Sequence, residues 1–369
     1  MPVQSNAKPV VIITGASGLI GTRLIDKLSK SYSCVALDVK PLPAGSQAFW
    51  VECDLTSGGS TMDAVKKIKD EYRDQVASVV HLAAYYDFSG EPSPLYEKLT
   101  VNGTKRLIEA LDDFHVEQFL FSSSLLVMKA AEKGQTLRES SPLEAEWDYP
   151  RSKLQAESVI NNGMQGNIPS VILRIAGVYD DHCNSIPIAQ HIKRIYEKDF
   201  ESYFFPGNPD HGQAFIHLHD LVDCLAKAIE LRSSLENQEL FLIAEPEVVS
   251  YGELQNRIGE LIHGTEWPTI RIPKTVAKAG AWAKEKVGGE DATFIKPWMV
   301  DLADAHYPVS IDRARHKLGW EPAHRLSAAL RGMIGFLLRD PRAWYEENHL
   351  PIPENLPEVA PSQGSRAES

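Results

Sequence analysis

The chain has 369 residues, of which 43% are hydrophobic and 24% charged, and this is the composition of a soluble globular protein. Fibrous, collagen-like and wholly disordered proteins are excluded. The formal net charge of -12 would repel a nucleic-acid backbone, so no nucleic-acid partner is expected.

Residues 1–8 are polar and predict a flexible N-terminus without an apolar leader. No stretch of the sequence reaches the ~18 to 20 apolar residues that a membrane span needs. We therefore expect a cytoplasmic protein without a membrane span. The cysteines lie far apart and form no C-x-x-C pair, which predicts four buried free thiols in a reducing compartment. These are Cys34, Cys53, Cys183 and Cys224.

From Pro9 onward, short apolar runs alternate with amphipathic segments, a pattern typical of βαβ units and a parallel sheet. Strands are expected at 10–14, 34–37, 49–51, 78–82 and 118–122. The first strand is followed by a helix with apolar side chains at helical spacing, namely Ile20, Leu24, Ile25 and Leu28. Two longer amphipathic helices are expected near 61–72 and 95–111.

The pattern is less regular after Tyr149. Further helices are expected at 149–160, 218–231 and 251–262, and further strands at 170–175 and 239–243. We interpret this half as a continuation of the sheet with insertions that build a pocket. The expected organisation is a first domain over 9–175, a mainly substrate-binding region over 176–341 with segments that return to the sheet, and a C-terminal tail over 342–369, disordered from about 351.

Between the first strand and the first helix, residues 14–21 read T-G-A-S-G-L-I-G. Gly15 permits a tight turn, Gly18 lets backbone N–H groups approach a pyrophosphate, and Gly21 allows the helix to pack closely on the strand. This position in the chain predicts a dinucleotide-binding loop. The cofactor contacts expected in it are Gly15, Ser17, Gly18, Leu19, Ile20 and Gly21.

Asp38 ends the second strand, 17 residues beyond Gly21. A carboxylate there can accept both hydroxyls of an adenine ribose, and it would repel the 2′-phosphate of NADP, so NAD is favoured. Lys40 nearby keeps NADP open as an alternative. The other interpretation of Asp38 is an ordinary strand-end residue in a turn.

Tyr149 and Lys153, in Y-P-R-S-K, are four residues apart and lie on one face of a helix in which Pro150 fits the first position. A general base at neutral pH requires the pKa of the phenol, ordinarily about 10, to fall to near 7. We expect Lys153 and a positively charged nicotinamide to lower it. A hydroxyl from the serines that follow Phe121 can hold the substrate oxygen while Tyr149 moves its proton.

Taken in order, T-G-x-x-G-x-x-G, Asp38, H-L-A-A, S-S-S and Y-x-x-x-K resemble the extended short-chain dehydrogenase/reductase family, which includes the NAD-dependent epimerases and dehydratases. The resemblance covers residues 9–341. It implies an α/β fold, a Rossmann-type doubly wound parallel sheet with a smaller C-terminal substrate-binding region. It also implies NAD as cofactor, a small-molecule substrate and a homodimer formed through the helices near 95–111 and 149–160.

The same resemblance makes Ser124, Tyr149 and Lys153 the matching catalytic positions, with Ser124 preferred to Ser123 because of its spacing to Val127. The further cofactor contacts that it implies are Asp54 and Leu55 at the adenine, Leu82, Ala83 and Ala84 at the pyrophosphate and nicotinamide ribose, and Tyr149 and Lys153. In T-V-N-G-T, Thr100 stands where the family usually has Asn, and its hydroxyl can replace the hydrogen bond of the amide.

Two segments bear on the substrate. Residues 212–220 read G-Q-A-F-I-H-L-H-D, without the Arg with which nucleotide-sugar enzymes of the family bind a diphosphate. Residues 306–315 and the following Leu-Gly-Trp resemble the 3β-hydroxysteroid dehydrogenase-like branch, whose substrates are apolar secondary alcohols and ketones. Tyr85, Tyr86 and Phe88 suit an apolar pocket wall or, equally, ordinary loop packing.

No metal is expected, because His217 and His219 are interpreted as alternating strand residues that point to opposite faces, and His211 is read as a further core or surface histidine. Residues 276–287 are read as a solvent-facing amphipathic helix. The leading hypothesis is an NAD-dependent oxidoreductase acting on a secondary alcohol or ketone. The alternatives are a nucleotide-sugar epimerase or dehydratase with tightly bound NAD, and a non-catalytic dinucleotide-sensing protein, although such proteins usually lose the Tyr or the Lys.

Overall fold

The computed structural model describes residues 8–87, 90–132, 134–164, 168–279, 300, 302–354 and 356. The chain folds into two compact units, of which the first comprises residues 1–177, 213–248 and 305–323 and the second comprises 178–212, 249–304 and 324–369. Several expectations fall outside the described residues: those for the N-terminus, Phe88, most of the helix at 276–287 and the tail beyond 356.

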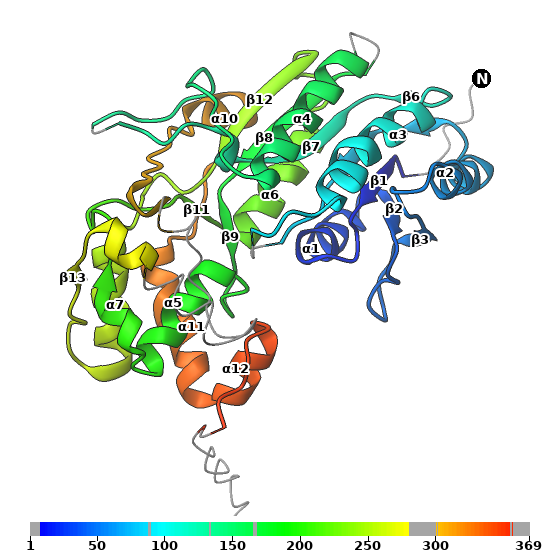
Figure 1. Cartoon of the computed structure of the whole chain (residues 1–369). Helices are drawn as coiled ribbons and strands as arrows, with labels where there is room; N and C mark the ends of the chain where they lie inside the picture. Colours follow the sequence, from blue (N-terminus) through cyan, green and yellow to red (C-terminus); the bar gives the residue numbers. More distant parts are fainter. Residues whose placement is uncertain are drawn as a thin grey trace, which may run out of the picture. The chain divides into compact units, whose positions relative to one another are not determined.

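The first unit contains a seven-stranded parallel sheet with the strand order β12-β8-β7-β5-β1-β2-β3 (Figure 1). Its strands are β1 (Val10–Thr14), β2 (Ser33–Asp38), β3 (Phe49–Glu52), β5 (Ser78–His81), β7 (Phe119–Ser124), β8 (Ser170–Ile175) and β12 (Gln238–Ile243). All seven strands expected from the sequence are confirmed. The strand order reverses between β1 and β5, and ligands of such sheets bind beyond the carboxyl ends of the strands at this point.

Helices cover both faces of the sheet. The helices of this unit are α1 (Leu19–Leu28), α2 (Gly58–Tyr72), α3 (Asn102–Ala110), α4 (Asp148–Gly163), α6 (Leu218–Glu230) and α10 (Asp312–Leu318). On one face, α3 packs between α2 and α4, whereas α1 and α6 pack against each other on the opposite face. The shorter elements of this unit are β4 (Gln75–Val76), β6 (His115–Val116), β11 (Phe215–His217) and a 3-10 turn, Leu125–Val127, while β9 (Gly177–Tyr179) begins at the last residue of the unit's first segment.

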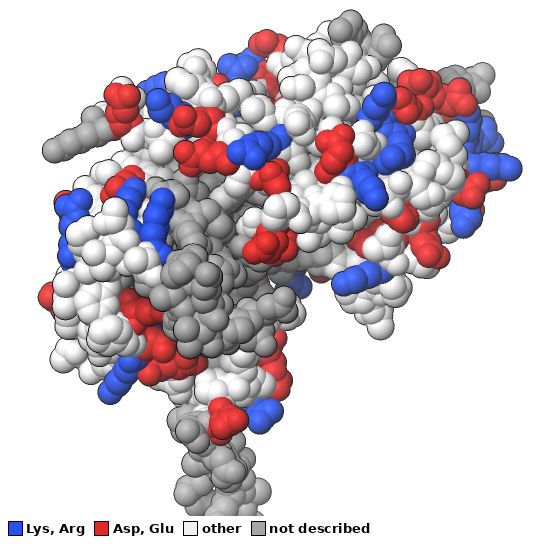
Figure 2. Space-filling model, viewed as in Figure 1, with Lys and Arg blue, Asp and Glu red and all other residues white. Residues whose placement is uncertain are grey.

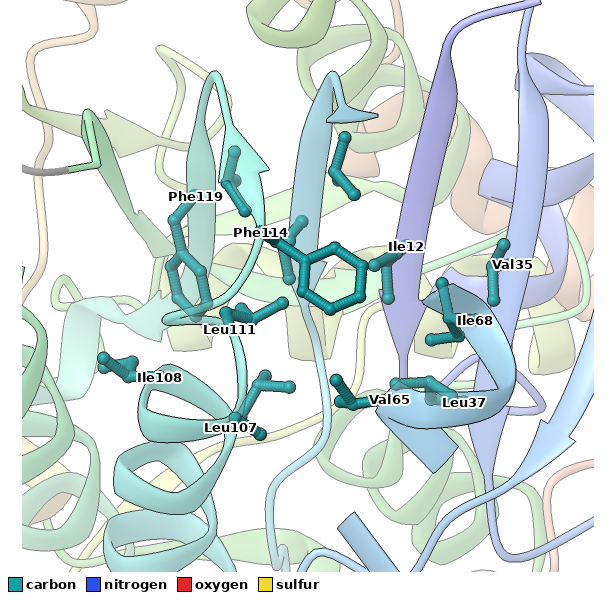
Figure 3. Close-up of a cluster of buried hydrophobic side chains, with 14 of the residues drawn as sticks. Ile12, Val35, Leu37, Val65, Ile68, Leu107, Ile108, Leu111, Phe114 and Phe119 are labelled. Carbon is teal, nitrogen blue, oxygen red and sulfur yellow. The ribbon is translucent and has the colours of Figure 1, made fainter. Parts of the chain in front are cut away.

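Figure 3 shows the core between the sheet and the face formed by α2, α3 and α4. Alternate strand residues such as Ile12, Val35 and Leu37 point into this core, as the two-residue period of a strand requires. Leu107 and Leu111 of the α3 region meet them from the helix layer. Because the intervening strand residues are buried on the other face, the strands read as continuous apolar runs.

Two local expectations need correction. The single helix expected near 95–111 is a π-helical segment, Tyr96–Val101, followed by α3, and this change of pitch brings Thr100 to the backbone of Tyr85. The catalytic-motif helix α4 begins at Asp148, so Pro150 occupies its third position rather than its first. Proline is tolerated there because the N–H groups of a first helical turn have no intrahelical partner.

The second unit is mainly helical. Its elements are α5 (Ile186–Tyr196), a 3-10 turn (Phe200–Tyr203), β10 (Phe204–Phe205), α7 (Tyr251–His263), β13 (Ile270–Arg271), a 3-10 turn (Leu302–Asp304), α11 (Leu326–Arg339) and α12 (Pro341–Glu347). In this unit α7 packs against α5 and α11, and α11 packs against α12. Residues 342–347, expected to belong to a tail, form α12 because Trp344 and Tyr345 are fully buried.

The four cysteines are buried and free, as predicted. Within the part of the chain that the structure describes, no helix has the length and apolar character required to cross a membrane. Figure 2 shows Lys and Arg side chains interspersed with Asp and Glu on the visible face, so the acidic excess is not gathered there into one patch.

Candidate active site

The loop after β1 follows a path that only glycine tolerates at its first position. Gly15 has a φ of +66°, and a Cβ at this position would lie 2.8 Å from the backbone nitrogen of Ala83. Both the left-handed backbone and the close approach of the segment after β5 exclude a side chain. The loop that carries Ser17 and Gly18 is therefore fixed against the 82–84 segment, which was expected to line the same cofactor.

Helix α1 begins immediately after this loop with Gly18 as its N-cap, and no side chain caps its first turn. A Cβ on Gly18 would meet only the Gly15 carbonyl oxygen, at 3.3 Å. A Cβ on Gly21, by contrast, would lie within 2.7 Å of Ala16 and Gly15 atoms, so α1 packs on the loop itself rather than on the strand as expected. Uncapped N–H groups with open space at Gly18 fit the pyrophosphate of a dinucleotide.

Asp38, at the end of β2, lies beside the same loop. Its Oδ2 accepts a hydrogen bond from the backbone N–H of Ser17 at 3.0 Å, and its Oδ1 accepts one from the backbone N–H of Lys40 at 3.0 Å. The Ser17 hydroxyl donates to the carbonyl oxygen of Lys40 at 2.7 Å, which closes the turn onto the loop. These contacts fix the carboxylate next to the glycine loop, in the position suited to a ribose.

The other residues expected to contact the cofactor differ in how much of their surface a ligand could reach. The Asp54 Oδ1 accepts hydrogen bonds from the backbone and hydroxyl of Thr56, at 2.8 and 2.7 Å. Leu55 is 4% exposed and packs in the hydrophobic core, so its side chain has little surface for an adenine. Leu82 and Ala84 are half-buried at the end of β5, where ligands of such sheets bind.

A buried chain of hydrogen bonds, which the sequence did not reveal, ties β1 to the segment after β5. His81 is fully buried, with its Nδ1 2.6 Å from the Thr14 hydroxyl and its Nε2 2.9 Å from the Thr104 hydroxyl. Since Thr104 donates to the Thr100 carbonyl, it must accept from His81 Nε2, and the Thr14 hydroxyl must donate to Nδ1. Thr14 Oγ1 in turn accepts from Ala83 N–H at 3.2 Å.

This network selects a neutral imidazole with its proton on Nε2. Burial, assisted by the charge of Lys153, lowers the pKa of His81 to about 3. Thr100 extends the network, because its hydroxyl accepts a hydrogen bond from the backbone N–H of Tyr85 at 3.0 Å. The Thr at the family's Asn position therefore supplies a hydroxyl contact of its own to the segment that follows H-L-A-A.

Ser124, Tyr149 and Lys153 come together at the carboxyl end of β7. Ser124 is the last residue of β7, and its side chain acts on the hydroxyl of Tyr149, whose pKa it lowers. The Nζ atom of Lys153 lies 6.0 Å from the centre of the Tyr149 ring and donates to the Ser122 carbonyl oxygen at 2.6 Å. Ser123 points elsewhere, to Glu157, so Ser124 is the serine that accompanies Tyr149.

The charges of the protein alone do not lower the pKa of Tyr149, and the expected joint effect of Lys153 and a bound nicotinamide stays a prediction. Burial raises that pKa to about 12, and the Ser124 side chain offsets the rise only in part. Burial also lowers the pKa of Lys153 to about 7, because the residue is only 3% exposed. Ionisation of Tyr149 near neutral pH thus requires a further positive charge, and a bound nicotinamide is a group that supplies one.

Two buried charged residues beneath this group were missed at the level of sequence. Arg174 of β8 forms a bidentate ion pair with Glu157 of α4, with N–O distances of 3.1 and 2.8 Å. Two signals could have shown them: Glu157 continues the four-residue spacing of Tyr149 and Lys153, and Arg174 interrupts an otherwise apolar strand.

Of the two described tyrosines that were expected to line a pocket, Tyr86 is the one that contacts Tyr149. Its ring lies edge-on to the Tyr149 ring with 4.9 Å between centroids, and half of its surface is exposed. Tyr85 instead makes an edge contact with the buried ring of Tyr96, with centroids 4.8 Å apart. The two tyrosines therefore differ, since Tyr86 presents aromatic surface beside Tyr149 and Tyr85 packs on the π-helical segment.

The prediction that His217 and His219 point to opposite faces of a strand is wrong, since residues two apart on a strand would share one face. β11 ends at His217, and α6 begins at Leu218, so the two residues do not alternate along a strand. The Nδ1 atom of His217 instead accepts a hydrogen bond from the backbone N–H of His219, and the ring centroids are 5.1 Å apart. His217 thus serves as the N-cap of α6.

A parallel sheet with a glycine loop at its switch point, an acid at the end of β2 and a Ser–Tyr–Lys group beyond β7 together define a Rossmann-type, dinucleotide-dependent enzyme. The sequence model of the NAD dependent epimerase/dehydratase family matches residues 11–244. The chain belongs to this family, and its cofactor is NAD.

Among curated proteins, sterol-4-alpha-carboxylate 3-dehydrogenase (decarboxylating) of Candida albicans is 29% identical over 191 residues, which cover 48% of this chain and 52% of that protein. The chain thus spans about half the length of this relative. Human 3 beta-hydroxysteroid dehydrogenase type 7 is 23% identical over 85% of this chain and 92% of its own. The solved structure of Thermotoga maritima UDP-glucose 4-epimerase with UDP-glucose has a TM-score of 0.66 at 18% identity, covering 90% and 100% of the two chains.

Proposed function

We propose that the protein interconverts a secondary alcohol and a ketone on a largely apolar, steroid-like substrate by hydride transfer. The observation that carries the proposal is the placement of Ser124, Tyr149 and Lys153 together at the carboxyl end of β7, with the buried Lys153 Nζ 6.0 Å from the centre of the Tyr149 ring. When bound, NAD supplies the acceptor or donor of the hydride. The side chains of the protein have to hold the reacting oxygen and move its proton.

The proton step follows from the positions of three side chains. Ser124, at the end of β7, is placed to hold the substrate oxygen, and Tyr149 beside it, as the phenolate, takes the alcohol proton and becomes the neutral phenol. Lys153 holds the nicotinamide ribose and contributes positive charge that favours the phenolate. In the ketone-reducing direction the Tyr149 phenol donates the proton, and its raised pKa keeps it protonated at neutral pH.

Two observations support an apolar substrate: an aromatic side chain lies beside Tyr149, and residues 212–220 lack an arginine that could bind a diphosphate. Tyr86 offers a half-exposed aromatic ring beside Tyr149. Residues 212–220 contain no Arg, and the neutral side chain of Gln213 cannot form a bidentate contact with a diphosphate. The similarity to a sterol dehydrogenase and to a hydroxysteroid dehydrogenase agrees with the same substrate class.

The experiment is to incubate the protein with NAD and, separately, with a panel of hydroxysteroids and a panel of UDP-sugars. NADH formation with one or more hydroxysteroids, and no epimerised sugar, is the expected result. Epimerisation of a UDP-sugar without net NADH formation would instead assign the protein to the nucleotide-sugar enzymes. Binding of NAD without turnover of either panel would support the dinucleotide-sensing alternative.

We also propose a homodimer formed through the helix layer that contains α3 and α4. The two helices pack against each other, and α4 presents exposed positions including Arg151 and Gln155 to solvent. Light scattering coupled to size exclusion should give twice the chain mass, and replacing Gln155 with Glu or Arg should reduce it. A single chain mass at all concentrations would refute the proposal.

A further inference from the structure

A buried charged group lies directly behind the candidate catalytic residues. Glu157 and Arg174 are each 4% exposed. The Glu157 carboxylate accepts two hydrogen bonds from the Arg174 guanidinium, one from Nε and one from Nη2. The Ser123 hydroxyl donates a third hydrogen bond to Glu157 Oε1, at 2.5 Å. Three elements, β7, β8 and α4, thus contribute to fixing one carboxylate in the interior.

Helix α4 and strand β7 hold both Glu157 and Lys153. Tyr149, Lys153 and Glu157 are spaced by four residues on α4 and therefore follow one another along one face of the helix. On β7, the carbonyl of Ser122 accepts from Lys153, and the hydroxyl of the next residue, Ser123, donates to Glu157. Consecutive strand residues thus hold the ammonium and the carboxylate at one helical turn from each other.

We propose that Glu157 is a positioning residue that keeps Lys153 protonated and in place behind Tyr149, and that Arg174 and Ser123 hold the Glu157 carboxylate in position for this role. The inference rests on the proposed function, because it explains how a buried lysine retains the charge that the tyrosine needs. Glu157 touches neither Tyr149 nor the position of a substrate in this account. It acts through Lys153 alone.

The charges around Lys153 support this assignment. The ionisable groups that face it are Tyr149 and Glu157 from its own helix and His81 from β5, while Arg174 of β8 is paired with Glu157. His81 is neutral at physiological pH. Burial lowers the pKa of Lys153, and the charge of Glu157 is the opposing influence that raises it. Removing that charge should make Lys153 lose its proton at a lower pH.

The first test uses the cofactor-free protein and does not depend on activity. Stability is measured by denaturant unfolding between about pH 6 and about pH 10, because a lysine with a lowered pKa makes stability rise with pH in this range. In Glu157→Gln the rise should begin at lower pH than in wild type. In a Lys153→Met background, Glu157→Gln should lower the free energy of unfolding by an equal amount at every pH. An identical pH dependence of the Glu157→Gln effect in both backgrounds would overturn the proposal.

The second test is the pH profile of kcat/KM for alcohol oxidation. When Lys153 loses its charge earlier, Tyr149 ionises at higher pH, so the acid limb of the profile should move to higher pH in Glu157→Gln. At a fixed pH on the acid side of the profile, kcat/KM of the variant should be about tenfold below that of wild type for each pH unit by which the acid limb moves. A merely structural role would lower kcat/KM equally at all pH values. Glu109→Gln, which removes an exposed ion pair with Lys105 on α3, is the matched control and should leave the profile unchanged.

Glu157→Gln leaves Arg174 buried without its partner, which endangers folding. The double variant Glu157→Gln/Arg174→Met removes both charges, and it should move the acid limb in the same direction but by less, because loss of the Arg174 charge offsets part of the loss of the Glu157 charge. A wild-type profile in the double variant would contradict the proposal. An inactive wild-type enzyme with a positive stability test would refute only the proposed function, whereas an active enzyme with an unmoved profile would refute only the role of Glu157.

Discussion

Gly18→Ala separates the requirements of the cofactor from those of the fold. Gly18 has φ −78° and ψ 174°, a conformation that alanine adopts freely, and the new Cβ would meet only one atom, the Gly15 carbonyl oxygen at 3.3 Å. Alanine is a poorer N-cap than glycine, so we expect the free energy of unfolding to fall by about 1 kcal/mol at most.

The expected effect of Gly18→Ala on NAD affinity is larger. The methyl group would stand in front of the uncapped N–H groups of α1, where the proposal places the pyrophosphate. Losing one hydrogen bond to a charged phosphate costs about 1.5 to 3 kcal/mol, which corresponds to a Kd about 10- to 100-fold higher. Isothermal titration calorimetry measures this directly.

Gly58→Ala is the matched control for this experiment. Gly58 is the first residue of α2, and a Cβ there would meet no atom within 4 Å. The control should bind NAD as wild type does and retain full stability. If Gly18→Ala also bound NAD with wild-type affinity, the pyrophosphate could not lie at the N-terminus of α1, and the placement of the cofactor would be wrong.

Three further predictions concern the hydrogen-bond network and the buried lysine. His81→Leu should lower the free energy of unfolding by about 2 to 4 kcal/mol because it leaves buried hydroxyls unpaired, whereas the exposed His115→Leu should change it little; denaturant unfolding compares them. Thr100→Val should lower the free energy of unfolding by about 1 to 3 kcal/mol, because the Tyr85 N–H loses its acceptor, whereas Thr100→Ser keeps the hydroxyl and should be as stable as wild type. Lys153 has a pKa of about 7 in the folded chain and 10.5 in model compounds, so the stability of wild type relative to Lys153→Met should rise between these pH values; a flat difference would contradict the burial argument.

The sheet was predictable because its strands are buried on both faces and read as apolar runs, as in β1 and β8. The glycine loop was predictable for a related reason, since Gly15 occupies a backbone conformation that few other residues tolerate. In both cases the local sequence carries the physical requirement.

The remaining features depend on contacts between distant segments. The raised pKa of Tyr149 results from burial by several elements, and the spacing of Y-x-x-x-K contains no information about it. The pairing of Glu157 with Arg174 joins α4 to β8 and was visible only as an unusual charge in each. His217 was misread for two reasons: the boundary between β11 and α6 falls immediately after it, and residues two apart on a strand share a face instead of pointing to opposite ones.

The central claim is that Tyr149 moves the proton of the reacting hydroxyl. The most direct test compares wild type with Tyr149→Phe in two measurements, NADH formation from a hydroxysteroid that wild type oxidises and binding of NAD by calorimetry. The account predicts that Tyr149→Phe binds NAD with an affinity close to that of wild type and loses at least about 100-fold in kcat, the lower range for a general acid–base group. A variant that binds NAD and turns over as fast as wild type would contradict it.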